Sequence, residues 1–144
     1  MEQNTRKINI GLNVKLLCSQ LSMFLNNTNY RNMWLVSPEL STDEDVEYLY
    51  NTKIYVRKAM RTYLNEGVKC LDIAAIDISK DYQSKELFTR FLIFAEKQGL
   101  PIYIENVQKE RFQNFFLDRG YIVTTKEPIT GTLCLYKPIA TNWE

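Results

Sequence analysis

The first part of the chain shows a helical hydrophobic period followed by a short apolar run. Val14, Leu17, Leu21 and Phe24 recur at the spacing of one helix face, and the polar cluster 26–29 ends the pattern. Residues 33–36 are uniformly apolar and are closed by a Ser-Pro pair, which is typical of a strand. The pattern predicts a core-covering helix and then the first strand.

A second helix is predicted to end before Gly67. Residues 41–44 read Ser-Thr-Asp-Glu, which is the spacing of a capping box with acidic residues in the first turn. A helix of this length is unusual in a small domain, and Asn51-Thr52 is the point at which it would divide. The apolar residues that would share one face are Val46, Leu49, Val56, Met60, Tyr63 and Leu64.

From residue 70 the pattern alternates strands and helices. Residues 70–78 are apolar and partly β-branched, which indicates a buried strand, and the polar turn 79–83 leads into a helix that starts near Ser84. Residues 102–105 form a second strand, expected to be parallel to the first because a helix connects them. The apolar face of that helix is formed by Leu87, Phe88, Phe91, Leu92 and Ala95.

The C-terminal part predicts one more helix and two more strands. The helix follows Asn106 and ends at Gly120. Residues 121–125 and 132–136 alternate on either side of a turn with Pro and Gly, so they should pair antiparallel. These elements predict an α/β fold, with helices packed on a mixed sheet, in a single domain of residues 1–144.

The turn after the strand 70–78 is the first place to expect chemistry. A loop that leaves a strand and opens a helix gathers backbone N–H groups at the positive end of the helix dipole, where a phosphate binds. Lys80, Lys85 and Arg90 add positive charge around this turn. The sequence therefore suggests anion capture here, with an ordinary strand-to-helix connection as the alternative.

In the order and spacing of its elements, the last half of the chain resembles the GNAT superfamily of acyl-CoA-dependent N-acetyltransferases. In that family a central strand leads to a Gln/Arg-x-x-Gly-x-Gly/Ala loop, and a later helix ends in an aromatic F-Y-x-x-x-G-F signature. Here residues 82–88 read Tyr-Gln-Ser-Lys-Glu-Leu-Phe, and residues 115–121 read Phe-Phe-Leu-Asp-Arg-Gly-Tyr.

The resemblance implies a fold, a co-substrate and a set of binding residues. The fold implied is a GNAT-like mixed, mainly antiparallel sheet with a central, splayed parallel strand pair and flanking helices. Acetyl-CoA is the implied co-substrate, and its acetyl group would pass to a primary amine. Loop amides would hold the coenzyme A pyrophosphate, and the splayed strands would hold the pantetheine arm. The binding residues implied are Ile76, Asp77, Ile78, Gln83, Ser84, Lys85, Glu86, Leu87, Phe88 and Asn106.

The chain also departs from the family pattern. Glu86 and Phe88 stand where the family loop has small residues, and Phe116 stands where the family often has a tyrosine general acid. The family's β-hairpin before the central strand is either hidden within residues 53–57 or replaced by a helix. We predict the helix, because the capping box and Gly67 frame it. These departures favour an alternative function, a GNAT-like scaffold without catalysis that serves as a binding or assembly protein, and a protein partner is possible.

The composition limits the available proton chemistry. The chain has no histidine, which excludes His-dependent nucleophiles, histidine zinc sites and imidazole bases. Glu105, at the carboxyl end of its strand, is the predicted catalytic group that relays the proton of the attacking amine, and a solvated surface acid is the alternative. Asp72 and Asp77 lie in an apolar strand on opposite pleat faces, and either needs a partner if it is buried.

The charge balance bears on partners. Eighteen basic and seventeen acidic residues leave a net charge of +1, which argues against a large nucleic-acid or membrane surface. Lys53, Arg57 and Arg61 are spaced four residues apart and would form a basic stripe on one helix face. We interpret this stripe as solvated surface, with nucleic-acid binding as a weaker third function.

The cysteines and the N-terminal segment indicate the compartment. Cys18, Cys70 and Cys134 are widely spaced in apolar runs, which is typical of buried thiols in a reducing environment, and no metal-binding pattern is present. A polar N-terminus and interruptions in the apolar stretch that follows argue against a signal peptide or a membrane span. The sequence predicts a cytoplasmic protein.

Overall fold

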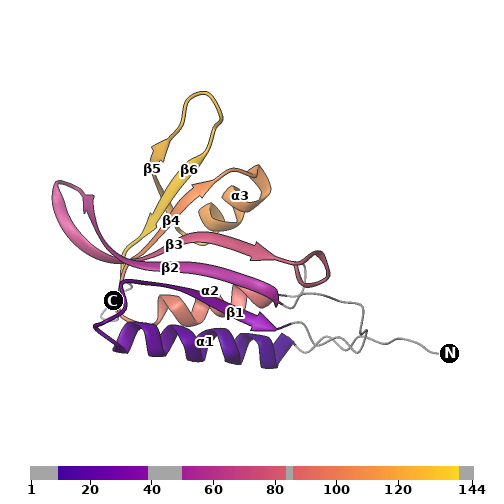
Figure 1. Ribbon diagram of the computed structural model, residues 1–144. Helices are drawn as coiled ribbons and strands as arrows, with labels where there is room; N and C mark the ends of the chain where they lie inside the picture. Colours follow the sequence, from indigo (N-terminus) through magenta and orange to yellow (C-terminus); the bar gives the residue numbers. More distant parts are fainter. Residues whose placement is uncertain (1–9, 39–49, 84–85, 140–144) are drawn as a thin grey trace, which may run out of the picture. The chain divides into compact units, whose positions relative to one another are not determined.

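A computed structural model describes residues 10–38, 50–83 and 86–139 (Figure 1). Within these residues the chain forms two compact units: unit 1 comprises residues up to Tyr55 and Ile76–Ala95, and unit 2 comprises Val56–Ala75 and the residues from Glu96 onward. The elements are α1 (Ile10–Asn26), β1 (Asn32–Pro38), β2 (Tyr50–Tyr63), β3 (Glu66–Ile78), η1 (Lys80–Tyr82), α2 (Leu87–Glu96), β4 (Ile102–Val107), α3 (Glu110–Asp118), β5 (Ile122–Lys126) and β6 (Leu133–Lys137).

Unit 1 contains the first predicted helix and strand, and both are confirmed. Leu17, Leu21 and Phe24 of α1 are fully buried, as the helical spacing predicts. The side chain of Gln20 joins α1 to β1, because it donates to the Val36 carbonyl at 2.7 Å and accepts from the Val36 amide at 2.9 Å. These bonds satisfy backbone groups of β1 that would otherwise need water.

The prediction of a helix before Gly67 is wrong for the residues of that segment that the structure describes. Residues 50–63 form the strand β2, and a two-residue turn at Leu64 and Asn65 leads into β3. Both turn residues have positive φ, 52° and 67°, which is the backbone of a type I′ hairpin turn. The hairpin that the resemblance implied is therefore present, whereas the capping box at 41–44 lies outside the described residues.

The strands form a mixed sheet in the order β1-β2-β3-β4-β6-β5. β3 and β4 are parallel and β5 and β6 are antiparallel, which confirms the two predicted pairings, and β4 also pairs antiparallel with β6. In the β3–β4 pair, the paired residues run from Leu71 with Ile102 to Ile73 with Ile104. Both strands continue past the last pair, β3 to Ile78 and β4 to Val107. The pairing of β4 with β6 is also irregular in this part of β4, because its register shifts between Ile104 and Val107.

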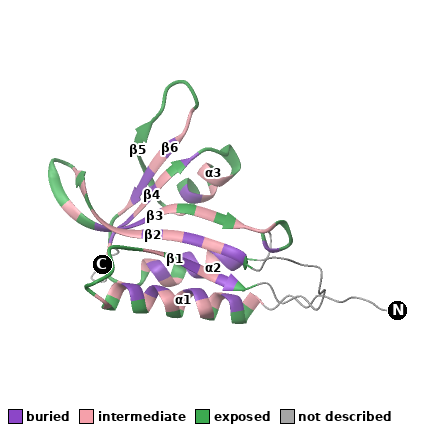
Figure 2. Cartoon of the chain, viewed as in Figure 1, coloured by how far each residue is buried: buried purple, intermediate pink, exposed green. Residues whose placement is uncertain are grey.

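The core of unit 2 is built from strand residues that alternate with the pleat. Leu71, Ile73, Ile102, Ile104 and Leu135 are at most 1% exposed. By contrast, β5 is exposed at every position (Figure 2). The predicted helices at α2 and α3 and the predicted strands at β5 and β6 are confirmed to within a few residues. Among the described residues, no helix has the length and apolar character needed to cross a membrane.

Candidate functional site

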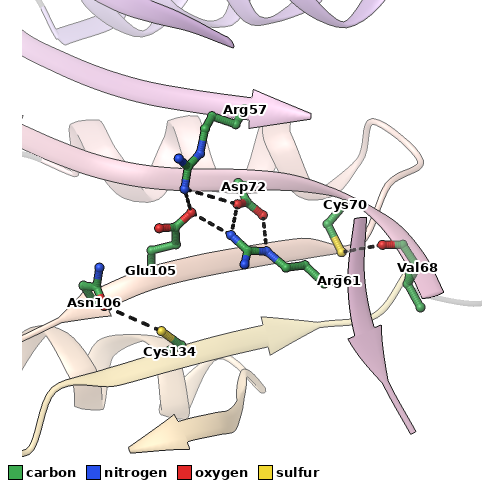
Figure 3. A network of polar contacts seen from close by, with 8 residues as sticks. All are labelled: Arg57, Arg61, Val68, Cys70, Asp72, Glu105, Asn106 and Cys134. Atoms are coloured by element: carbon green, nitrogen blue, oxygen red, sulfur yellow. Dashed lines mark hydrogen bonds and ion pairs between the residues drawn. The ribbon is translucent and has the colours of Figure 1, made fainter. Parts of the chain in front are cut away.

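Unit 2 contains a cluster of four charged side chains from three adjacent strands (Figure 3). Arg57 and Arg61 come from β2, Asp72 from β3 and Glu105 from β4. A spacing of four residues keeps Arg57 and Arg61 on one face of β2, because strand side chains alternate with a period of two. We call these four residues the charge cluster.

Each arginine of the charge cluster contacts both carboxylates. Arg61 Nη2 donates to Glu105 Oε2 at 2.8 Å and to Asp72 Oδ2, while its Nε donates to Asp72 Oδ1 at 3.2 Å. Arg57 Nη2 donates to Glu105 Oε2 and lies 3.7 Å from Asp72 Oδ2. The basic stripe is therefore mostly neutralised by acids on neighbouring strands.

Burial separates the two carboxyl groups of the charge cluster. The side chain of Asp72 is 0% exposed and that of Glu105 is 15% exposed. Desolvation raises the pKa of Asp72 to about 6, against the opposing effect of the Arg61 hydrogen bonds. Burial also acts to raise the pKa of Glu105, but the hydrogen bonds with Asp72 and Arg57 outweigh it, so that pKa is lowered. Asp72 is thus the carboxyl that protonates first.

Tyrosine rings border the charge cluster. The Arg61 guanidinium lies 4.2 Å from the centre of the Tyr103 ring, and Tyr103 is the cross-strand partner of both Asp72 and Tyr136. The ring of Tyr136 in turn lies 4.3 Å from that of Tyr63. Sequence reasoning missed this arrangement, although an aspartate inside an apolar strand signalled that a cationic partner was needed.

The predicted pyrophosphate loop lies in unit 1 and is described except for Ser84 and Lys85. The amides of Tyr82 and Gln83 donate to the carbonyls of Ser79 and Lys80 at 2.9 and 3.4 Å, so both are engaged within η1. The Gln83 side chain donates to the Ile78 carbonyl at 2.8 Å, which ties the turn to the end of β3.

The residues that open α2 show what the two bulky loop positions do. Glu86 is exposed and has a φ of 63°, and its carbonyl accepts from the Arg90 amide at 3.0 Å. Leu87 and Phe88 are buried, and the Phe88 ring lies 6.1 Å from that of Phe91. The side chain of Phe88 therefore belongs to the hydrophobic core of unit 1.

The other predicted binding residues lie in different units. Ile76 and Ile78 are half-buried and Asp77 is exposed, all in the part of β3 that belongs to unit 1. Asn106 belongs to unit 2, where it is exposed with a φ of 55° and its Oδ1 lies 3.8 Å from the Cys134 Sγ. Glu105, the predicted catalytic residue, is also in unit 2.

Phe116, which stands at the family's tyrosine position, is fully buried. Its ring packs 4.8 Å from Phe112 and 5.2 Å from Tyr121, measured between ring centroids. The side chain stabilises the packing of α3, and its ring carries no proton to donate.

The overall backbone is similar to those of several solved structures, one of which is described as an acetyltransferase. A structure described as histone acetyltransferase HPA2 and related acetyltransferase from Corynebacterium glutamicum is 12% identical, covers 96% of this chain and 82% of its own, and has a TM-score of 0.54. The AtaTR complex bound with acetyl-CoA is 12% identical, with coverages of 92% and 90% and a TM-score of 0.53. The KacTA–DNA complex is 14% identical, with coverages of 96% and 89% and a TM-score of 0.51.

A further similarity is more limited. For a mutant AtaT toxin bound to acetyl-CoA and the C-terminus of antitoxin AtaR, the match spans 62% of this chain and 61% of the other, at 12% identity and a TM-score of 0.49. No protein-family model matches the sequence. No curated protein matches it either. The structural similarities establish that the chain has the GNAT fold, as the sequence resemblance implied.

Proposed function

We propose that this protein is an acyl-CoA-dependent N-acyltransferase that transfers an acetyl group to a primary amine. The observation that carries the proposal is the limited pairing of the parallel strands, whose register ends at Ile73 and Ile104 although both strands continue. Strand edges beyond such a point can pair with the amides of a ligand, as peptide-binding sheet edges do. The GNAT fold and the acetyl-CoA-bound AtaTR structure support this choice of ligand.

In unit 1, we propose that the turn into α2 binds the coenzyme A diphosphate. The segment comprises Gln83, Ser84, Lys85, Glu86, Leu87 and Phe88. An α-helix leaves its first N–H groups without intrahelical acceptors, and these groups attract anions. Burial of Leu87 and Phe88 directs their side chains into the core, and exposed Lys80 and Arg90 add positive charge. Ile76, Asp77 and Ile78 of this unit remain proposed contacts of the pantetheine arm.

In the proposed reaction the amine nitrogen attacks the thioester carbonyl, so that an N–C bond forms and the C–S bond breaks. The nitrogen loses one proton, and the leaving thiolate gains one. Glu105 is the proposed acceptor of the nitrogen's proton, since its carboxylate is partly exposed. Holding the two substrates in line would supply much of the rate.

The test is calorimetric titration with acetyl-CoA. Wild type should release or absorb heat with a single site, and the double variant Lys80→Ala/Arg90→Ala should bind about three- to tenfold more weakly, the effect of two exposed charges near a phosphate. Lys15→Ala, an exposed lysine on α1, is the matched control and should bind like wild type. Absence of heat from wild type at millimolar acetyl-CoA would reject the enzyme.

That negative result would favour the second candidate, a GNAT-fold binding protein without catalysis. The observations that favour it are the exposed carboxylate of Glu86 at the start of α2, which repels a diphosphate, and the buried phenyl ring at position 116. A wild-type protein that binds acetyl-CoA but does not turn it over with any amine would also fit this candidate.

A further inference from the structure

The contacts of the charge cluster meet at two carboxylate oxygens. Asp72 Oδ2 and Glu105 Oε2 each contact the Nη2 atom of Arg57 and the Nη2 atom of Arg61. The two oxygens therefore share the same pair of cationic nitrogen atoms (Figure 3), and the Asp72 side chain is fully buried whereas that of Glu105 is 15% exposed. Like-charged carboxylates that share a site resist being ionised together.

We propose that Asp72 and Glu105 act as one proton-sharing pair, in which Glu105 exchanges protons with the surroundings and Asp72 holds the shared proton behind it. Arg57 and Arg61 keep the pair compact, because each bridges both carboxyl groups. Asp72 is a positioning residue in this scheme, since it is fully buried and acts through Glu105.

The groups that face Asp72 come from two strands, and its complete burial disfavours its ionised form. Arg57 and Arg61 face it from β2, and Glu105 and the Tyr103 ring face it from β4. Cys70, the neighbour of Asp72 on β3, adds no charge near neutral pH, because burial raises the pKa of its thiol to about 11. The raised pKa of Asp72 agrees with this geometry.

The pair has a consequence for catalysis that rests on the proposed function. When the amine nitrogen loses its proton, an N–H bond breaks and an O–H bond forms on Glu105, so the charge of the pair rises by one. The same proton is then available for the leaving thiolate, whose S–H bond forms as the O–H bond breaks. One carboxyl pair would thus serve as base and acid, which compensates for phenylalanine at position 116.

The test is a carboxyl-carbon NMR titration of the full chain without any substrate. In wild type one aspartate should titrate at about pH 6, and that signal should be missing from Asp72→Asn. In Glu105→Gln the same signal should move down by about one pH unit or more, since the neighbouring negative charge is gone. Asp77→Asn, an exposed aspartate on the same strand, should leave it unchanged.

An Asp72 midpoint that is the same in wild type and in Glu105→Gln would overturn the pair, and so would the absence of any carboxyl titrating near pH 6. The wild-type and Glu105→Gln spectra decide the question even if Asp72→Asn does not fold. Because no acetyl-CoA is present, failure of the calorimetric test would remove the proposed enzyme and leave this titration intact.

Discussion

At the scale of single residues, Asp72 is the position that most constrains the sequence around it. A fully buried carboxylate is costly unless cations and hydrogen bonds compensate it, and here two arginines from the neighbouring strand do so. The sequence showed that Asp72 or Asp77 would need a partner if it were buried. It did not identify Arg57 and Arg61 as that partner, because a four-residue spacing fits one helix face and one strand face equally well.

Removing Arg61 should destabilise the protein. Arg61→Ala leaves the buried Asp72 with Arg57 at 3.7 Å as its remaining arginine. We expect a loss of about 2 kcal/mol in unfolding free energy, less than for a fully buried pair because Arg61 is partly exposed. Urea unfolding measures it. Lys69→Ala, an exposed change on β3, should stay within about 0.5 kcal/mol, and an equal loss in both variants would contradict the role of the charge cluster.

The pH dependence of the unfolding free energy should also report the ionisation of Asp72. Its pKa is about 6 in the folded protein and ordinarily 3.8, so its contribution to stability is full below the ordinary value and is lost as pH rises through about 6. The shift corresponds to about 3 kcal/mol at most. Glu105 acts in the opposite sense, because its pKa is lowered and its contribution is lost as pH falls.

The stability of wild type relative to Asp72→Asn should therefore decrease between about pH 4 and pH 6. Urea unfolding of the two proteins at steps across this range measures the difference. A difference that does not change with pH would show that Asp72 ionises in the folded chain as it does in the unfolded one.

At the scale of elements, the sequence predicted correctly the helices and strands whose apolar residues repeat at one spacing and whose ends carry a residue that breaks the pattern. α1, α2 and the parallel β3–β4 pair are confirmed, because their buried residues repeat at one spacing and Asn, Gly or Pro ends them. β2 was predicted as a helix because the capping box at 41–44 and Gly67 framed the segment, and its apolar residues also fit a helix face. Tertiary pairing with β1 and β3 decided the outcome, and no local pattern records that pairing.

The turn of the β2–β3 hairpin is a site for stabilisation. Leu64 is 78% exposed and has a φ of 52°, a conformation that costs a branched side chain energy and that asparagine tolerates well. Leu64→Asn should raise the unfolding free energy by about 1 kcal/mol, measured by thermal or urea unfolding. Leu64→Val should lower it, since β-branching worsens the strain. Identical stabilities for the two variants would contradict the type I′ turn.

The candidate site was only partly predictable at this scale. Glu105 was selected because it falls at the carboxyl end of a strand, where α/β sheets bind ligands, and Gln83 because residues 82–88 resemble the family's pyrophosphate loop. The network that lowers the pKa of Glu105 joins β2, β3 and β4, so it depends on strand order and register. A single sequence contains neither quantity.

At the scale of the whole molecule, binding and turnover are assigned to separate units and should be separable by mutation. The proposed diphosphate segment belongs to unit 1 and the proposed proton acceptor to unit 2. Glu105→Gln should therefore leave the calorimetric affinity for acetyl-CoA unchanged while it lowers kcat about 10²- to 10⁴-fold, the usual contribution of one general base. Lys80→Ala/Arg90→Ala should weaken acetyl-CoA binding and leave kcat at saturation near wild type, because those charges are proposed to contact the diphosphate and not the reacting groups. A Glu105→Gln variant with wild-type kcat would move the proton acceptor to water, whereas a joint loss of binding and turnover in both variants would show that the two units do not divide the work as proposed.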